Sequence, residues 1–325
     1  MIRLVKYVVF PSIYDYDKVT YQTMEKKDYI FVFSSISEHF KFKITKFLIR
    51  VHFSLKINRI FNIPFKILWI KHILNSFLKN NDRIIFLFYE SNRLSLDYKL
   101  LSELKRFYTN SSIVFRMSNS ISNNRIPPIY KHIKDYDLVI TFDPLDAIKF
   151  NIQYIQYEYE PLFEKSDNQK LYYDLLFIGN NKGRIDILHT IYLEFKKCGL
   201  KCLFIVNNVD KDKQVINEPN FIYNEPISYK QVLEKVQESK ILLEVLQGYQ
   251  NGQTLRYREA IYFNKYLLSN NRELFDNDDV PLLSIDKNIC EFLPDNFKLF
   301  KPVPNNNILS VDNFLLRIEN ILQQK

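Results

Sequence analysis

The chain has 325 residues, of which 46% are hydrophobic and 15% aromatic, so it can form the cores of two domains and is not expected to be disordered. Its three cysteines are too few for a disulfide framework or a complete zinc site, and they suit a reducing cytoplasm. The formal net charge of +8 comes from one segment, because without the nine Lys and Arg of residues 41–81 the chain has 36 basic and 37 acidic residues.

Short apolar runs bounded by polar residues predict buried strands in the first half of the chain. The first run, Leu4 to Phe10, ends at Pro11 and is followed by acidic residues, which is unlike a secretory signal. Further strands are predicted at residues 29–33, 83–89, 112–115 and 138–142, and a helix at 94–107. Strands that alternate with amphipathic helices indicate a parallel sheet covered on both faces. Residues 1–160 are therefore expected to form one doubly wound α/β domain.

The basic segment, residues 41–81, contains no Asp or Glu, and apolar and aromatic side chains separate its nine positive charges. No run reaches the roughly 18 apolar residues that a membrane-spanning helix needs. Two interpretations remain open: helices that lie on an anionic membrane surface, or core-packed helices with a solvated basic face. Nucleic acid is not an expected partner, because neither a helix-turn-helix pattern nor an RNA-binding aromatic signature accompanies the charges.

A polar stretch around Pro161, residues 159–171, predicts a linker to a second domain, residues 172–325. Strands of that domain are predicted at residues 174–178, 202–206, 241–245, 266–268 and 282–285. Helices are predicted at 183–197, 228–239, 253–263 and 311–322, and the last of these can also pack back on the first domain. The expected architecture is two Rossmann-like, doubly wound domains that face a cleft.

All five glycines of the chain lie between Gly179 and Gly252. Gly179 follows a predicted strand, and Gly183 begins the next helix. Glycine permits a tight turn and a close ligand approach, and a helix N-terminus offers free N–H groups to an anion. Lys182 and Arg184 add positive charge, so phosphate is the expected ligand. The string GNNKG matches neither the dinucleotide nor the P-loop motif, and it is also compatible with an ordinary turn.

A second glycine loop, between Gly248 and Gly252, follows another predicted strand and leads into a helix. The first turn of this helix contains Thr254 and again exposes N–H groups at the carboxyl end of a strand. Arg256 lies nearby, and Glu259, one turn further along, can accept hydrogen bonds from both hydroxyls of a ribose. The two loops together predict a site for the diphosphate and ribose of a nucleotide.

Three stretches of the chain carry a resemblance to a known family. GQTLRYREAIYFNKYLLSNN resembles the glycine loop, Arg, Glu-Ala and strand of group 1 glycosyltransferases of the GT-B fold, in particular the bacterial capsule and lipopolysaccharide branch. YDLLFIGNNKGRIDIL is similar to the segment that opens their nucleotide-sugar domain, and ITFDPLDAIKFNIQYI resembles the segment that closes their acceptor domain. The resemblance covers residues 136–271 and is thin before residue 113.

The resemblance implies a metal-independent enzyme without a cofactor, which transfers a sugar from a nucleoside diphosphate sugar to a glycan or lipid-linked acceptor in surface polysaccharide biosynthesis. It implies a place in the cytoplasm or, peripherally, at the inner face of the membrane. The expected donor-binding residues are Gly179, Asn180, Lys182, Gly183, Arg184, Glu225, Gln247, Gly248, Gly252, Gln253, Thr254, Leu255, Arg256 and Glu259. Asn251 stands where retaining members often carry the first of two glutamates, so the stereochemistry of transfer is not predicted.

An inverting transfer needs a base for the acceptor hydroxyl, and the candidates follow strands of the first domain. They are Asp15 and Asp17 after the first strand, Glu90 after the third and Asp143 after the last. Glu90, which ends the run IIFLFYE, is the preferred base. Asp143 precedes Pro144 and is also explained as a helix cap.

No metal site is predicted, because the five His are scattered and the acidic run at residues 276–279 is typical of a solvated loop. A Rossmann oxidoreductase is disfavoured, since neither half contains a GxGxxG motif followed by an acidic residue about 20 positions on. A non-catalytic nucleotide-binding or scaffold protein of the same fold remains the alternative, because it would need the same glycines.

Overall fold

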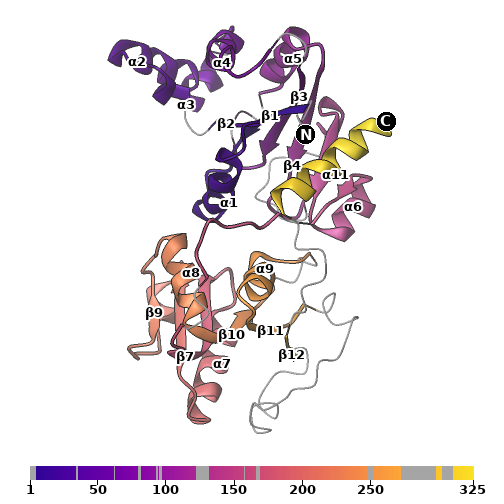
Figure 1. The fold of residues 1–325 in the computed structure, drawn as a ribbon. Coiled ribbons are helices and arrows are strands. Elements are labelled where there is room, and N and C mark those ends of the chain that lie inside the picture. Colours follow the sequence, from indigo (N-terminus) through magenta and orange to yellow (C-terminus); the bar gives the residue numbers. More distant parts are fainter. Residues whose placement is uncertain are drawn as a thin grey trace. The chain divides into compact units, whose positions relative to one another are not determined.

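The computed structural model describes residues 5–33, 36–61, 63–79, 82–92, 94, 97–121, 132–156, 158–165, 169–246, 252–271, 298–301 and 310–325. The chain divides into two compact units: unit 1 is Met1–Leu162 with Ser310–Lys325, and unit 2 is Phe163–Leu309. Each unit has its own largely parallel sheet with helices between successive strands (Figure 1). The predicted α/β class with two doubly wound sheets is confirmed.

The sheet of unit 1 has six parallel strands in the order β2-β1-β3-β4-β5-β6. The strands are β1 (Val5–Phe10), β2 (Ile30–Val32), β3 (Arg83–Tyr89), β4 (Ser111–Arg116), β5 (Leu138–Thr141) and β6 (Gln153–Tyr154). The chain leaves β1 for β2 on one side and then returns to β3 on the other. The strand order therefore reverses between β1 and β3, and the carboxyl ends at this switch point are where such sheets bind ligands.

Apolar side chains on both faces of β3 explain why this strand lies at the centre of the sheet. Residues 84 to 89 are all buried, as expected for a parallel strand with helices on both sides. The rings of Phe10 and Phe88 stack with centroids 4.2 Å apart, which ties β1 to β3. The helices α1 (Asp15–Glu25), α5 (Tyr98–Phe107) and α6 (Pro144–Phe150) connect the strands. Asp97 caps α5, so that helix begins later than the predicted residue 94.

The described residues of the basic segment fold into three short helices of unit 1, α2 (Lys43–His52), α3 (Leu55–Ile60) and α4 (Lys66–Leu74), and the short helix η1 (Ile36–His39) precedes the segment. Of these, α4 is the one that enters the core, where Ile67, Ile70 and Leu74 pack against β1 and β3. In α2 the buried residue is Ile49. The core-packed interpretation of this segment therefore applies to α4, whereas α2 attaches by one side.

The terminal helix α11 (Val311–Gln323) packs on unit 1. Phe314 and Ile318 are fully buried on its inner face. The hydroxyl of Tyr7, in β1, donates to the carbonyl of Leu315 at 3.0 Å and to the carboxylate of Glu319 at 2.6 Å. The helix thus contributes to the core of the first unit, although the chain reaches it only after unit 2.

The sheet of unit 2 has the order β12-β11-β10-β7-β8-β9, and β12 alone runs antiparallel to its neighbour within the described strands. The strands are β7 (Tyr173–Asn180), β8 (Cys202–Asn207), β9 (Phe221–Tyr223), β10 (Ser239–Glu244), β11 (Tyr266–Ser269) and β12 (Lys298–Phe300). When the six strands are numbered along the chain, their order in the sheet is the doubly wound order of dinucleotide-binding domains. The order reverses between β7 and β10, which is the switch point of this sheet. The strand predicted at residues 282–285 lies outside the described residues.

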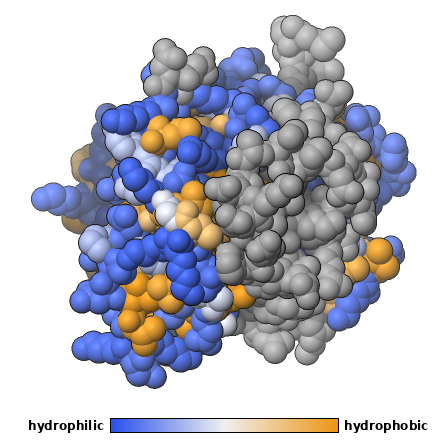
Figure 2. All heavy atoms as spheres, turned by 90° about the horizontal axis from the view of Figure 1, so that it is seen from below, coloured by the Kyte–Doolittle hydropathy of each residue, from blue (hydrophilic) through white to orange (hydrophobic). Residues whose placement is uncertain are grey.

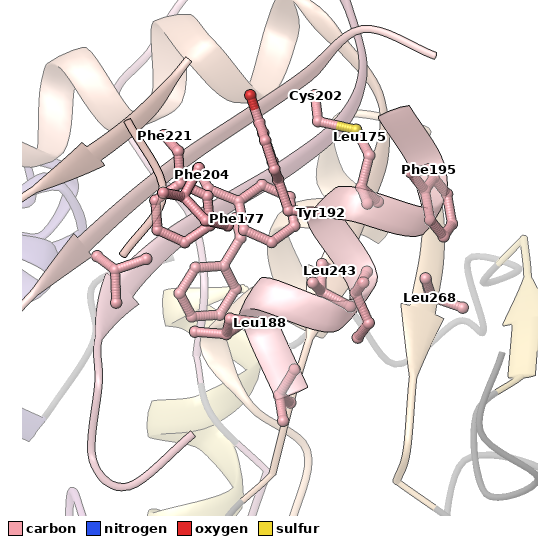
Figure 3. Packing of buried hydrophobic residues seen from close by; sticks show 14 of the residues in the cluster. Leu175, Phe177, Leu188, Tyr192, Phe195, Cys202, Phe204, Phe221, Leu243 and Leu268 are labelled. Carbon is pink, nitrogen blue, oxygen red and sulfur yellow. The ribbon is translucent and has the colours of Figure 1, made fainter. Parts of the chain in front are cut away.

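Three helices, α7 (Ile185–Lys197), α8 (Tyr229–Gln237) and α9 (Leu255–Tyr262), connect the strands of unit 2. Figure 3 shows Tyr192 of α7 among Phe177, Phe204 and Phe221 of the sheet. The ring of Tyr192 meets those of Phe204 and Phe221 edge-on, at 5.3 Å and 5.0 Å, the geometry that aromatic quadrupoles favour. Seen from below, the described surface is mainly hydrophilic, with apolar residues in separate small patches (Figure 2).

Candidate functional site

The first turn at the switch point of unit 2 runs from β7 into α7. Asn181 is buried, and its side-chain oxygen accepts a hydrogen bond from the backbone N–H of Arg184 at 2.9 Å. Lys182 and Gly183 have positive φ angles of 47° and 81°, so the chain reverses within two residues. Gly179 lies earlier, in the extended end of β7, where an added Cβ would meet its nearest neighbour at an ordinary 3.5 Å. The conformational reason for glycine therefore holds at Gly183 and is wrong for Gly179.

Arg184 links the ends of two neighbouring strands. Its guanidinium donates to the carbonyl of Asn180, the last residue of β7, at 2.7 Å, and to the carbonyl of Val245, just after β10. Its Nε donates to the carbonyl of Asn181 at 3.2 Å. Because Arg184 also precedes the first residue of α7, a guanidinium and the positive end of a helix lie together at the switch point.

Gly183→Ala is expected to destabilise unit 2 by roughly 1–2 kcal/mol, the cost of a left-handed backbone for a residue with a Cβ. Urea unfolding followed by far-UV circular dichroism measures this change. Gly183→Asn should lose less stability than Gly183→Ala, since Asn tolerates the left-handed conformation. Gly179→Ala should lose little stability. Equal stability of Gly183→Ala and the wild type would contradict the assigned turn.

The second turn at this switch point begins α9. Thr254 is the N-cap: its hydroxyl oxygen accepts from two backbone N–H groups of the first helical turn, at 3.1 Å and 3.4 Å, and its hydroxyl donates to Glu244. Glu244 ends β10, is buried, and accepts a second hydroxyl bond from Ser269 at the end of β11. Burial raises the pKa of Glu244, while these two hydroxyls and the charges of Arg256 and Arg184 oppose the rise.

Glu244 was not among the residues that the sequence analysis singled out. The available signal is a carboxylate inside the otherwise apolar run ILLEVL, since Glu is almost never fully buried unless it is paired. Through its hydrogen bonds with Thr254 and Ser269, Glu244 connects the ends of β10 and β11 to the start of α9. These bonds hold the turn before α9 at the same sheet edge as the turn before α7.

Glu259 lies in α9 and is fully buried, with 0% exposure. One of its carboxylate oxygens accepts from the hydroxyl of Tyr229 at 2.7 Å, and the other pairs with the guanidinium of Arg256. Arg256 also donates to the carbonyl of Ile178, in β7, at 2.9 Å. Burial raises the pKa of Glu259, and Arg256 and Tyr229 oppose the rise. This geometry differs from the expected one, in which both oxygens face ribose hydroxyls: here Glu259 holds Arg256 at the strand ends.

Two further predicted donor residues lie in the turn before α9. The buried Gly252 accepts a hydrogen bond at its carbonyl from the side chain of Asn271, at 3.3 Å. The side-chain oxygen of Gln253 accepts from the buried Arg258 at 2.6 Å. Leu255 is the first residue of α9 and is half-buried. The structure thus brings this turn to the same edge of the sheet as Arg184.

The other predicted donor residues are placed differently. Gln247 and Gly248 lie outside the described residues. Lys182 is exposed in the first turn. Glu225 is exposed after β9, and β8 separates that strand from β7, so the side chain starts about 10 Å from the switch point. The structure does not bring Glu225 to the other donor residues.

Glu90 follows β3 at the switch point of unit 1. Its Oε2 accepts hydrogen bonds from the backbone N–H groups of Ser118, at 2.6 Å, and Asn119, at 2.8 Å, which follow β4. Burial raises the pKa of Glu90, and these hydrogen bonds and the charge of Arg116 oppose the rise. The preferred candidate base therefore lies at the expected edge, anchored to the loop after β4.

Asp17 lies in α1, on the other side of the same switch point. The residue is buried, and its Oδ2 accepts no hydrogen bond from any described residue. Burial raises the pKa of Asp17 to about 6; Glu158 adds to the rise, whereas Arg116 and a serine hydroxyl oppose it. Asp17 lies in the first turn of the helix after β1, and Glu90 directly follows the neighbouring parallel strand β3, so both carboxyl groups lie at the same edge of the sheet. Burial and the charges of Glu90 and Asp17 raise the pKa of Tyr14.

The other two candidate bases are explained by local structure. Asp15 is exposed in the first turn of α1 and pairs with Lys18 at 3.1 Å. Asp143 is buried as the N-cap of α6 and accepts from the N–H groups of Leu145, at 3.0 Å, and Asp146, at 3.4 Å. Local contacts thus account for both carboxylates, Asp15 by a surface ion pair and Asp143 by a helix cap, and their roles as bases stay predictions.

A buried ion pair lies beneath this edge and was not predicted. Arg116, the last residue of β4, donates to Glu158 through Nε at 3.2 Å and through a terminal nitrogen at 3.1 Å. The two side chains are 3% and 2% exposed. Tyr89 also donates its hydroxyl to Glu158, and the guanidinium lies 4.7 Å from the Tyr89 ring centroid. The carboxylate is therefore partnered on both oxygens in the core, and the charge of Arg116 opposes the rise that burial causes in the pKa of Asp17 and of Glu90.

The described residues contain no group of three His, Cys, Asp or Glu arranged to hold a metal ion. The acidic run at residues 276–279 lies outside them. The positive groups that the described residues bring to the switch point of unit 2 include the guanidinium groups of Arg184 and Arg256 and the N-termini of two helices.

No protein-family model and no curated protein matches the chain. Among solved structures it is similar to TarM, with 16% identity and a TM-score of 0.40 over 78% of this chain and 52% of that one. It is similar to the GtfA/B complex, with 9% identity and a TM-score of 0.40 over 79% and 53%. A third is the DNA modifying enzyme beta-glucosyltransferase, with 13% identity and a TM-score of 0.38 over 81% and 79%. The chain spans about half the length of the first two matched chains.

Proposed function

We propose that this protein transfers a sugar from a nucleoside diphosphate sugar to a glycan or lipid-linked acceptor. Unit 2 binds the donor, and unit 1 binds the acceptor and supplies the base. The pathway we propose is surface polysaccharide biosynthesis of the capsule or lipopolysaccharide kind, at the cytoplasmic side of the membrane. The reaction requires charge stabilisation on the leaving diphosphate, and protein cations can supply it without a metal ion.

The observation that carries the proposal is the convergence of two arginines on the switch point of unit 2. Arg184 comes from the turn after β7 and donates to the carbonyl of Val245, just after β10, while Arg256 lies in the first turn of α9 and donates to the carbonyl of Ile178 in β7. The N-termini of α7 and α9 begin at the same edge. Guanidinium groups and helix N-termini are the donors that diphosphates prefer, and the carbonyls that now accept from Arg184 are weaker partners than phosphate oxygens.

Arg184→Ala is expected to weaken binding of UDP or GDP by roughly 10- to 100-fold, the loss of one charge-assisted hydrogen-bonding group. Isothermal titration measures the affinity. The nucleotide affinity of Arg184→Lys should lie between those of Arg184→Ala and the wild type, because an ammonium retains the charge without the planar fork. Lys197→Ala is the matched control, since Lys197 is an exposed cation at the opposite end of the same helix.

The loss should be smaller for the nucleoside monophosphate, because Arg184 is assigned to the diphosphate. Equal affinities of folded Arg184→Ala and wild type for every nucleoside diphosphate tested would contradict the donor site. Nucleotide binding without donor hydrolysis, and without transfer to any polysaccharide or lipid extract, would favour the alternative of a non-catalytic nucleotide-binding scaffold.

A further inference from the structure

The helix α2 presents an apolar face that the core of unit 1 does not cover. Ile44, Phe47 and Leu48 lie at helical spacing on one side, and they are 75%, 64% and 50% exposed. Phe42, just before the helix, is also exposed. An amphipathic helix of a globular protein normally turns its apolar face toward the protein core. The apolar face of α2 instead points away from the core of unit 1.

The opposite side of α2 holds the helix to unit 1. Ile49 is buried there. The indole N–H of Trp69, in α4, donates to Nδ1 of His52 at 2.9 Å, and the other ring nitrogen of His52 lies 2.7 Å from the carbonyl of Pro64. Because an indole nitrogen can only donate, Nδ1 accepts and the second nitrogen carries the proton. The helix is therefore fixed in orientation, and its exposed face does not result from a loose attachment.

The exposed apolar residues concentrate in this part of the chain. Among the described residues, eight of the nineteen large hydrophobic side chains that are exposed fall between residues 42 and 68: Phe42, Ile44, Phe47, Leu48, Ile60, Phe61, Phe65 and Leu68. Scattered exposed apolar residues are normal, but a concentration of them marks an interaction surface.

The charges beside this face indicate the partner. Lys43, Lys46 and Arg50 follow one flank of α2, and residues 41–81 contain nine Lys and Arg without Asp or Glu. Protein interfaces are depleted of Lys, whereas a helix with aromatic and aliphatic residues on one face and cations beside it suits an anionic bilayer. No helix in the described part of the chain has the length and apolarity needed to cross a bilayer.

We infer that α2 docks unit 1 on an anionic membrane surface, with Ile44, Phe47 and Leu48 in the acyl boundary and the flanking cations among the lipid headgroups. This inference goes beyond sugar transfer and does not depend on it. Each cation near the surface strengthens binding several-fold, and salt screens that contribution.

The test is flotation of the full chain with vesicles of phosphatidylcholine alone and of phosphatidylcholine with phosphatidylglycerol. The wild type is expected to float with the anionic vesicles. Phe47→Ser/Leu48→Ser should lower the partition coefficient by roughly 10- to 100-fold, because two apolar side chains no longer insert. Lys43→Gln/Arg50→Gln should lower the partition coefficient about tenfold or more on anionic vesicles only, and salt should weaken the binding of this variant less than that of the wild type.

Leu145→Ser/Ile148→Ser is the matched control, because these apolar residues of α6 are 51% and 81% exposed in the same unit. It should float like the wild type. The inference is overturned if the wild type does not float with the anionic vesicles. It is also overturned if Phe47→Ser/Leu48→Ser floats with them as well as the wild type does. It is also overturned if ultracentrifugation shows that this double variant abolishes a dimer instead. UDP binding in solution should be equal in all these variants, which separates this test from that of the donor site.

Discussion

Asp17→Asn is expected to lower kcat/KM by about 10²- to 10⁴-fold, the usual contribution of a general base. The reason is its buried carboxyl group at the switch point of unit 1, with a pKa of about 6 and an oxygen that accepts no hydrogen bond from the described residues. A base must be ionised to accept the acceptor's proton, so kcat/KM of the wild type should rise with pH through about 6. Initial rates of transfer between pH 5 and 8 measure this.

The same substitution should stabilise the protein near neutral pH. Below pH 4 the carboxyl is protonated in both folded and unfolded chains and contributes nothing. Between pH 4 and 6 the unfolded chain releases the proton first, because the folded pKa is raised to about 6. The free energy of unfolding therefore falls as pH rises through this window, and the penalty persists above it. Asp17→Asn should remove a penalty on the order of 2–3 kcal/mol at pH 7.

Asp15→Asn is the matched control, two residues away in the same helical turn but exposed. It should change neither rate nor stability appreciably. If Glu90→Gln abolishes transfer while Asp17→Asn retains it, the base is Glu90. A variant Asp17→Asn that is both inactive and less stable than the wild type would indicate a structural role instead.

Arg116→Met is expected to destabilise unit 1 by about 3–5 kcal/mol, because it leaves the buried carboxylate of Glu158 without its charge partner. Urea unfolding followed by tryptophan fluorescence measures the change, since the only Trp of the chain, Trp69, lies in unit 1. A variant Arg116→Met as stable as the wild type would contradict this cause.

A second substitution tests the pairing directly. Arg116→Met/Glu158→Gln should recover most of the lost stability, because a neutral amide can still accept from Tyr89 without a buried charge. Lys105→Met is the matched control: it breaks the ion pair of Lys105 with Asp137, whose side chains are 39% and 35% exposed, and it should cost less than about 1 kcal/mol.

Local patterns in the sequence were enough to predict most of the helices and strands. The run IIFLFY predicted β3 to the residue, because a continuous apolar run of this length fits a strand buried on both faces. The strand β9 was missed, since three residues are too few for a period to be recognised. The first turn of unit 2 was located from Gly179 and Gly183, and the second from Gly248 and Gly252. Gly183 has the left-handed backbone expected of glycine, whereas Thr254, expected inside the helix, is its N-cap.

The candidate site could be predicted less completely. Asp15 and Asp17 are two residues apart and chemically identical, yet one pairs with a surface lysine and the other is buried beside a distant ion pair. Glu259 was assigned to a ribose from its position in the helix, whereas the structure places it against Tyr229 and Arg256. The burial and the pKa of these carboxyl groups depend on partners far away in the sequence, which the spacing of neighbouring residues does not predict.

The sequence by itself determined most of the elements and the loops at the carboxyl ends of the strands, because propensity and periodicity act over a few residues. The tertiary structure alone decided the order of the strands, and with it the two switch points that bring Arg184 to Arg256 and Asp17 to Glu90. The physical reason is that a parallel sheet places neighbours by packing and hydrogen bonding between segments tens of residues apart.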